Sequence, residues 1–415
     1  MKKRLHKGLV ASAVLALTAG LLTPAQAATT VLIWADETRG PNLVKTLKDK
    51  SDWVAGVDIE VKSFSNFDAL KAAIDAATAT SGPDIVVGAN DWVPTLAKNG
   101  KLAPITLTAT QRAGFSSSQF YDLTYQKKLY GVPVDVNNVA MIYNTKLVTT
   151  APKTFGDMVD YYKANKSSKN LKAGLCVAGG GMSWGAHSIA SALGADAYYF
   201  NADGRINKSK VFNPVAFGTN VKKYLIDGKK SNGFLPASDT GCKDNFLAGT
   251  VPFAIIGNWE WTDYTAKGFA MNLMPVPGVT AGQSGNAFGS VSGALLTTFA
   301  ATRGREAAAK SVLTDFFAST AGQVAYQKYE KRPPAQKGAA SSPSVTDGQK
   351  GFGASAAAAS IPQVGAILNG SGKSYWDSLP AYWTAVLVDG KDAVAEAKKL
   401  ANIYRDNLRA AAGNI

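Results

Sequence analysis

The sequence predicts an exported α/β protein folded into two lobes, and three observations support this. The chain has 415 residues, which is more than one hydrophobic core usually serves. From residue 31 onward, short apolar runs alternate with helical patterns. The first 27 residues have the composition of a signal peptide. The length and the alternation together predict two lobes, each with a sheet covered by helices.

The leader has the three parts of a signal peptide. Four Lys or Arg residues among the first seven are followed by an apolar run from about Leu9 to Leu22, and then by a cleavage signal that ends at Ala27. The run is shorter than the ~20 residues that a membrane-spanning helix needs. We therefore expect residues 1–27 to be removed, and the mature protein to reach the periplasm or the outer cell surface. No Cys near Ala27 offers a site for a lipid anchor.

The first part of the mature chain alternates strand and helix. Strands are expected at residues 31–34, 59–61 and 84–87. Asn66 is expected to cap a helix with Phe67, Leu70 and Ile74 on one face. This order predicts a mostly parallel sheet covered by helices on both faces, with ligands at the carboxyl ends of its strands.

A second series of strands and helices predicts the second lobe. Strands are expected near residues 130–134, 140–144, 175–177, 251–256 and 271–275, with a helix capped by Thr154 between the second and the third. Three further segments follow: a helix at about 305–318, a polar linker-like stretch at 332–360 and an amphipathic C-terminal helix. The apolar stripe of the last helix contains Val394, Ala397, Leu400, Ala401, Tyr404 and Leu408.

Charge does not indicate a nucleic-acid partner. The formal charge is +14, of which the four basic leader residues contribute a part. The remaining Lys residues are scattered, and no basic and aromatic module is present. We interpret the excess as solvated surface.

The cysteine and histidine content restricts the chemistry. Cys176 and Cys242 are the only cysteines, and an even pair in an exported chain favours a disulfide over two buried thiols. Beyond the leader, His187 is the only histidine, so neither a zinc site nor a serine hydrolase triad is expected. The run Gly179-Gly180-Gly181 lacks the Lys-Ser/Thr of a phosphate-binding loop. The sequence therefore predicts no metal and no cofactor.

Glycoside hydrolysis stays open as an alternative. It requires two carboxylates at a set separation, which a sequence cannot measure. Asp91 and Glu260 are candidates among 30 acidic residues, so this signal is weak.

The tryptophans are more informative than the acids. A sugar ring has an apolar face and a rim of hydroxyls, so its binding sites combine flat aromatic rings with polar side chains. Trp92, Trp184 and Trp259 stand beside polar or Gly residues, and binding and core packing are equally open for them. Core packing is favoured for Trp34 and Trp53, as it is for Trp261.

A series of ordered motifs resembles the maltose/maltodextrin-binding protein family, the extracellular sugar-binding proteins of ABC importers. The resemblance extends from about Val31 to Arg409 and depends on the order and spacing of the motifs. They include Ile33-Trp34-Ala35-Asp36-Glu37-Thr38-Arg39-Gly40, Gly82-Pro83-Asp84-Ile85, Ala89-Asn90-Asp91, Tyr130-Gly131-Val132-Pro133, Met141-Ile142-Tyr143-Asn144 and Ile256-Gly257-Asn258-Trp259-Glu260-Trp261.

The resemblance implies a two-lobed class II periplasmic-binding-protein fold with a hinge and a ligand cleft between the lobes. It implies an N-lobe of residues 28–135 plus 290–332, and a C-lobe of residues 136–289 plus 333–415. The chain should cross between the lobes near Val134–Asn138, Gly289–Ala294 and Arg332–Ala335. Ligand binding would close the lobes.

The resemblance also implies the polar part of the site. Asp36 and Arg39 fall in a loop whose polar groups contact sugar hydroxyls in the family, and Asp91 matches an Asp that accepts hydroxyl hydrogen bonds. Asn137 falls where the maltose binder has a Glu.

Aromatic positions agree with the family only in part. Trp259 matches a stacking Trp and Trp184 a stacking Tyr, while Trp376 is expected to supply the last platform. Trp92 replaces a family Arg, and Gly88 stands where the family has a Trp. These departures rearrange the subsites, so another oligosaccharide or a disaccharide remains open beside maltose.

The expected function is that of a monomeric, non-catalytic solute-binding protein. It would capture a malto-oligosaccharide or related sugar and deliver it to the permease of an ABC importer. The alternatives from other classes are a sugar-sensing surface receptor and an exported glycoside hydrolase.

Overall fold

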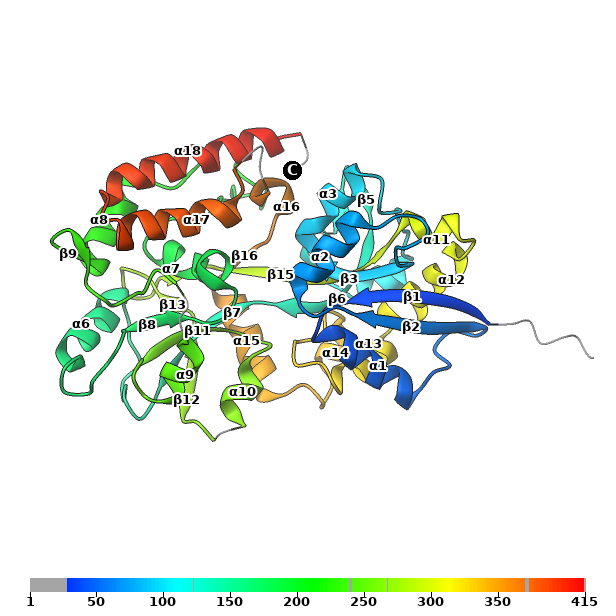
Figure 1. Cartoon of the computed structure of the whole chain (residues 1–415), viewed down its shortest axis with the longest axis horizontal. Helices are drawn as coiled ribbons and strands as arrows, with labels where there is room; N and C mark the ends of the chain where they lie inside the picture. Colours follow the sequence, from blue (N-terminus) through cyan, green and yellow to red (C-terminus); the bar gives the residue numbers. More distant parts are fainter. Residues whose placement is uncertain (1–27, 122, 239–240, 267, 370–372, 414–415) are drawn as a thin grey trace, which may run out of the picture.

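A computed structural model describes residues 28–121, 123–238, 241–266, 268–369 and 373–413. The expected leader, residues 1–27, lies outside the described residues. Figure 1 shows two lobes side by side, joined by strands that run from one into the other. Within the described ranges, no helix is long and apolar enough to cross a membrane.

The N-lobe, on the right in Figure 1, contains the first six strands and returns later in the chain. Its first elements are β1 (Thr29–Ala35), α1 (Arg39–Asp49), β2 (Val57–Ser63), α2 (Phe67–Ala76), β3 (Ile85–Ala89), a 3-10 turn (Asn90–Trp92), α3 (Val93–Lys98), α4 (Ala109–Ala113), α5 (Ser117–Tyr121), β4 (Thr124–Tyr125), β5 (Lys128–Leu129) and β6 (Gly131–Asn137). The later ones are β15 (Ala287–Leu296), α11 (Thr298–Thr302), α12 (Glu306–Ser311), a π-helix (Val312–Phe317), α13 (Thr320–Gln327) and α14 (Lys337–Ala340).

The C-lobe contains the central part and the end of the chain. Its central elements are β7 (Val139–Asn144), α6 (Phe155–Asn165), β8 (Leu175–Val177), a π-helix (Gly181–Gly185), α7 (His187–Ala192), α8 (Pro214–Leu225), β9 (Ile226–Asp227), β10 (Lys230–Ser231), α9 (Cys242–Leu247), β11 (Phe253–Gly257), α10 (Trp261–Thr265), β12 (Met271–Met274), β13 (Val276–Pro277) and β14 (Ser284–Gly285). Its last ones are α15 (Asp347–Ala358), β16 (Ser360–Pro362), α16 (Gly365–Leu368), α17 (Tyr375–Trp383), a π-helix (Thr384–Val388) and α18 (Ala393–Ala411).

The N-lobe strands belong to a sheet of order β16-β15-β3-β1-β2, in which β6 also pairs with β15. This sheet extends into the C-lobe, where β16 pairs with the first residues of β15. β1 runs parallel to β2 and β3, as the alternation of strand and helix predicts. The carboxyl ends of β1 and β3 therefore meet at one edge of the sheet, where Asp36 and the turn Asn90–Trp92 follow them. A single core of buried residues packs this sheet against its helices.

The C-lobe sheet has the order β12-β7-β11-β8 and contains both parallel and antiparallel pairs. Only β8 and β11 run parallel, while β7 is antiparallel to both of its neighbours. The reason is topological: β7 enters directly from the N-lobe strand β6, so it does not share the direction of the strands that follow helices. Alternate residues of this sheet face two separate cores.

Chain crossings connect the lobes at three places. β6 ends in the N-lobe at Asn137, and β7 begins in the C-lobe at Val139. Within β15, Phe288 belongs to the C-lobe core and Val291 to the N-lobe core. The third crossing lies later than residues 332–335, because residues 333–340 remain against the N-lobe. There Pro334 pairs with Asp135, and the amide of Lys337 donates to the carbonyl oxygen of Gly114 at 2.8 Å.

Two local expectations are wrong. The stretch 332–360 is no linker, because it holds α14 and α15, and Phe352 of α15 is fully buried in the C-lobe. A capping box between Thr346 and Gln349 starts α15. Phe67 does not join Leu70 and Ile74 in the core; it is 36% exposed. It occupies the first turn of α2, whose buried residues are Leu70 and Ile74 alone.

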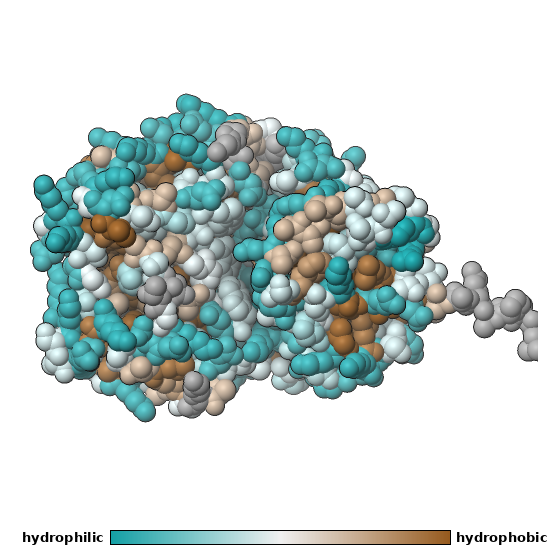
Figure 2. Space-filling view, in the orientation of Figure 1, coloured by the Kyte–Doolittle hydropathy of each residue, from teal (hydrophilic) through white to brown (hydrophobic). Residues whose placement is uncertain are grey.

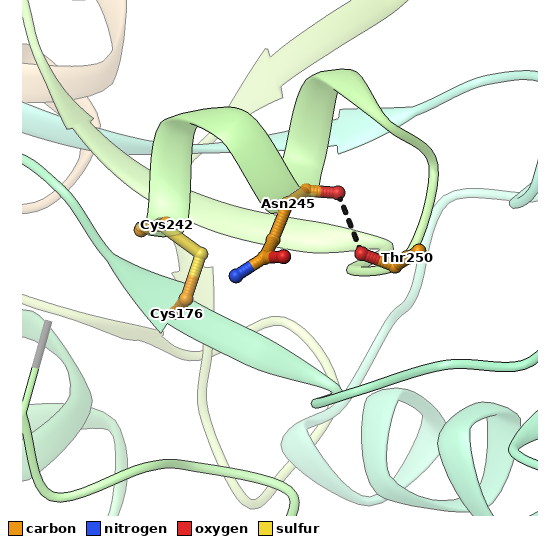
Figure 3. Close-up of a disulfide and its surroundings, with 4 residues drawn as sticks. All are labelled: Cys176, Cys242, Asn245 and Thr250. Carbon is orange, nitrogen blue, oxygen red and sulfur yellow. Dashed lines mark hydrogen bonds between the residues drawn. A yellow bond between two sulfur atoms is a disulfide. The ribbon is translucent and has the colours of Figure 1, made fainter. Parts of the chain in front are cut away.

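Cys176 and Cys242 form a disulfide in the C-lobe (Figure 3). It joins β8 to the first residue of α9, with the two Cα atoms 5.5 Å apart. Nearby, the hydroxyl of Thr250 donates to the carbonyl oxygen of Asn245 at 3.0 Å, which holds the end of α9. The covalent link therefore attaches this helix to one face of the sheet, within the smaller C-lobe core.

Candidate functional site

A cavity of about 770 Å³ lies between the lobes. The space-filling view shows the surface hollowed between the two masses (Figure 2). Residues from both lobes and from β15 line the cavity. It brings together all eight residues that the sequence singled out for ligand binding: Asp36, Arg39, Asp91, Trp92, Asn137, Trp184, Trp259 and Trp376.

Arg39 is the centre of a buried charge network in the N-lobe wall. Its guanidinium donates to Asp135 at 2.7 and 2.9 Å and to Asp36 at 2.5 Å. The carboxylate of Asp36 also accepts from the backbone amide of Arg39 at 2.8 Å and from Thr38. Asp36 and Asp135 are each 1% exposed. Most of the hydrogen-bonding capacity of Asp36 and Arg39 is therefore used inside the protein.

Asn137 extends this network to the crossing segments. Its side-chain oxygen accepts from Arg39 at 3.1 Å and from Arg332 at 2.9 Å. Its amide nitrogen donates to Asp135 and to Ser292 of β15, both at 3.1 Å. An amide can serve here because it both donates and accepts, which an ionised Glu would not do.

Burial and charge act in opposite directions on these acids. Burial alone would raise the pKa of Asp36, but the Arg39 and Arg332 guanidinium groups hold it well below its ordinary value. The pKa of Asp135 is likewise lowered, because the attraction of Arg39 exceeds the effect of burial. Both carboxylates remain ionised in the folded protein at neutral pH.

Asp91 has the opposite electrostatic character. Burial raises the pKa of its carboxyl to about 6, although Lys71 and hydrogen bonds oppose the shift. The hydrogen bonds and the positive charge around this carboxylate, which lines the cavity, do not fully compensate for its loss of water. Added hydrogen-bond donors there would favour its ionised form.

Three tryptophans of the cavity each lie directly over a glycine. A β-carbon placed on Gly88 would stand 2.3 Å from the Trp92 ring, one on Gly180 would stand 2.5 Å from Trp184, and one on Gly257 would stand 2.4 Å from Trp259. Only glycine leaves room for an indole to lie this close to the backbone. The same arrangement explains the departures at Gly88 and Trp92, because the Trp92 ring fills the space above Gly88.

The C-lobe wall is aromatic. Trp184 and Trp259 have ring centroids 5.7 Å apart at 38°, and the guanidinium of Arg332 lies 5.4 Å from the ring of Trp259. Trp184 stands on the π-helix Gly181–Gly185, and Trp376 on the first turn of α17. All three indoles are only partly buried.

Two amide side chains orient these rings and connect the lobes. The indole N–H of Trp184 donates to Gln363 at 2.7 Å, and that of Trp376 donates to Asn369 at 3.2 Å. In turn, Asn369 donates to the carbonyl oxygen of Asp91 at 3.0 Å, and Asn90 donates to that of Gln363 at 2.7 Å. The residues 363–369 therefore hold the C-lobe platforms against the N-lobe.

Several cavity residues were not predicted as site residues from the sequence: Phe67, Lys71, Arg332, Gln363 and Asn369. The sequence does contain one signal for the aromatic part, since a glycine precedes each of three tryptophans by two or four positions. Among the described residues, no group of three His, Cys, Asp or Glu side chains could hold a metal ion.

Comparison with known proteins identifies relatives of this architecture. The family described as "Bacterial extracellular solute-binding protein" matches residues 42–353. A solved structure of the Thermus thermophilus maltotriose-binding protein with bound maltotriose matches with a TM-score of 0.68 at 19% identity, and covers 90% of this chain and 99% of that one. The likeness shows the two-lobed periplasmic-binding-protein fold that the sequence predicted.

Curated relatives match over part of their length. The maltotriose-binding protein of Pyrococcus abyssi is 28% identical over 223 residues, which are 50% of this chain and 44% of the relative. The maltodextrin-binding protein of Bacillus subtilis is 23% identical, over 58% of each chain. The galactooligosaccharide-binding protein of Bacillus subtilis is 23% identical over 64% of this chain and 63% of the relative. The chain thus spans less than two thirds of each.

Proposed function

The chain belongs to the bacterial extracellular solute-binding protein family, and from that premise we propose that it binds a malto-oligosaccharide between its lobes and delivers it to an ABC importer. The observation that carries the proposal is the pairing of three half-exposed indoles with hydrogen-bonding groups around one cavity. The names of the relatives from Pyrococcus abyssi and Bacillus subtilis support the class of sugar.

The proposed binding mechanism combines stacking with hydrogen bonding. The apolar faces of the sugar rings lie on Trp184, Trp259 and Trp376, while their hydroxyls reach Asp91 and Asn137. Closure of the lobes excludes water and strengthens these hydrogen bonds. The backbone change is absorbed where β6 and β15 cross between the lobes.

Asp36 and Arg39 are proposed to act on the sugar mainly through their neighbours. Their buried network supports Asn137 and Arg332, which face the cavity. Trp92 provides the corresponding support in the N-lobe wall. The ligand would thus meet a rigid polar surface on one side and aromatic platforms on the other.

We propose that the mature chain, after removal of residues 1–27, works outside the cytoplasmic membrane as a monomer that presents its closed form to the permease. It is proposed to have no catalytic activity. Asp91 and Glu260, the acids considered for hydrolysis, are occupied differently: Glu260 accepts from the backbone amide of Gly257 at 2.8 Å, whereas Asp91 lines the cavity.

The proposal is tested by titrating residues 28–415 with maltose, maltotriose, a longer maltodextrin and a galactooligosaccharide, with calorimetry and tryptophan fluorescence as readouts. Saturable binding of the α-glucans is expected. Binding of the galactooligosaccharide alone would keep the mechanism and change the substrate. Silence toward every sugar, or release of reducing sugar during incubation, would refute the proposal. Loss of uptake after gene deletion would separate an importer component from a surface receptor.

A further inference from the structure

The N-lobe wall of the cavity carries a partly exposed aromatic ring at the start of α2. Phe67 is 36% exposed and lines the cavity. It lies outside the N-lobe core, although Leu70 and Ile74 of the same helix are fully buried. Exposed apolar area beside a cavity is typical of a surface that a ligand covers.

Phe67 also covers its neighbour. Its ring centroid lies 4.7 Å from that of Trp92, at 41°. Trp92 is consequently only 5% exposed, so the ring that this wall mainly offers to a ligand is that of Phe67. Trp92 in turn rests on Gly88, which makes a continuous stack from the strand β3 outward.

The surroundings of Phe67 suit a sugar. Asp68, which is exposed, and Lys71, one turn further along α2, line the same cavity. An aromatic face flanked by charged hydrogen-bonding groups matches the apolar face and hydroxyl rim of a pyranose. The backbone at Phe67 is held in place, because the side chain of Asn66 caps the helix by accepting from the amide of Ala69 at 2.7 Å.

We propose that Phe67 is a sugar-stacking residue of the N-lobe, supported from behind by Trp92, so that the oligosaccharide is held between aromatic surfaces of both lobes. This inference rests on the proposed function. It assigns to the N-lobe an aromatic subsite of its own, in addition to the tryptophans of the C-lobe. Asp68 and Lys71, which line the cavity from the same helix, would supply hydrogen bonds to that sugar ring.

The test is the dissociation constant for maltotriose, measured by calorimetry on residues 28–415 carrying Phe67→Ala, Phe67→Leu or Phe67→Tyr. Phe67→Ala is expected to weaken binding about tenfold and Phe67→Leu nearly as much, because a leucine keeps apolar area but no flat face. Phe67→Tyr should remain within about twofold of the wild type. The matched control is Phe200→Ala, since Phe200 is 38% exposed and lies in the C-lobe outside the residues that line the cavity.

The outcomes separate this inference from the function on which it rests. Wild-type binding with Phe67→Ala or Phe67→Leu within twofold of it would overturn the stacking role alone. Equal losses in Phe67→Ala and Phe200→Ala would overturn it as well. Absence of wild-type binding to any malto-oligosaccharide would remove both proposals. Thermal unfolding of each variant identifies any loss caused by misfolding, and Phe67→Tyr provides the aromatic variant that is expected to fold and bind.

Discussion

The two walls of the cavity use their side chains in opposite ways. In the N-lobe wall, Arg39 and its carboxylate partners satisfy one another and are almost fully buried. In the C-lobe wall, Trp184 and Trp259 keep part of their rings exposed beside the cavity. A polar residue beside a ligand cavity can therefore serve the fold, while an incompletely buried aromatic residue there is available to a ligand.

The largest expected effect is on stability, from Arg39→Met. The change leaves the buried carboxylates Asp36 and Asp135 without their main counter-ion, and the free energy of unfolding should fall by about 3–5 kcal/mol. Urea denaturation at pH 7 measures it. Arg409→Met is the control, because Arg409 has 71% of its side chain exposed, and should change stability by less than about 0.5 kcal/mol. Similar values for the two variants would contradict the structural role of the network.

Trp259→Ala should have the next largest effect, and on binding. We expect the affinity for maltotriose to fall by about 2–4 kcal/mol, since a large aromatic platform is lost. Calorimetry measures the affinity, and urea denaturation reports whether the fold is kept. Trp53→Ala is the matched control: Trp53 is also half-buried but packs on Phe316, away from the cavity lining, so it should affect stability and leave binding unchanged. If Trp259→Ala binds maltotriose as the wild type does, the aromatic C-lobe wall is not the ligand-binding wall that we propose.

The acidic residues of the N-lobe wall should make stability depend on pH in opposite directions. The lowered pKa values of Asp36 and Asp135 add stability above about pH 4, which is lost as the pH falls through their folded-state values. Asp91 affects stability in the opposite direction, because burial raises the pKa of its carboxyl to about 6. Its contribution to the free energy of unfolding is most favourable below about pH 4 and falls as the pH rises to about 6. The free energy of unfolding of Asp91→Asn should therefore increase by about 2 kcal/mol relative to that of the wild type as the pH rises from 4 to 8.

The affinity for the sugar should also depend on the ionisation of Asp91. If sugar hydroxyls donate to the Asp91 carboxylate, the ligand favours the ionised form, and affinity rises between pH 5 and pH 7 in the wild type but not in Asp91→Asn. Denaturation and calorimetry at a series of pH values measure the two effects. A wild type with no change in affinity over this range would exclude Asp91 from direct contact.

The sequence predicted the architecture and indicated eight residues that line the cavity, and their roles in ligand binding stay predictions. The motifs indicated eight residues that line one cavity, where the carboxyl ends of the parallel strands β1 and β3 meet at one edge of the sheet. The motifs could not reveal that Arg39 already has Asp135 as a partner, since the two are 96 positions apart. Partnership across such a separation depends on the sheet pairing and not on local pattern.

Local pattern also misled in two places. Phe67 has the spacing of a core residue, but periodicity does not tell where the first turn of a helix stands relative to the edge of a sheet. The small and polar composition of residues 332–360 indicated a linker, yet the capping pair Thr346 and Gln349 was present in the sequence as the start of a helix. A capping pair is therefore a more specific indicator of local structure than composition.

The smallest expected effect tests the glycines beneath the tryptophans. Gly257→Ala would place a β-carbon 2.4 Å from the Trp259 ring, so the ring must move, while the backbone at this strand residue tolerates alanine. We expect the affinity for maltotriose to fall by about 1 kcal/mol, with a change in indole emission. Gly351→Ala is the control, because its β-carbon would meet no atom within 4 Å. If Gly257→Ala binds within twofold of the wild type, Trp259 adapts its position, and the aromatic wall is shaped by the ligand as much as by the glycine beneath it.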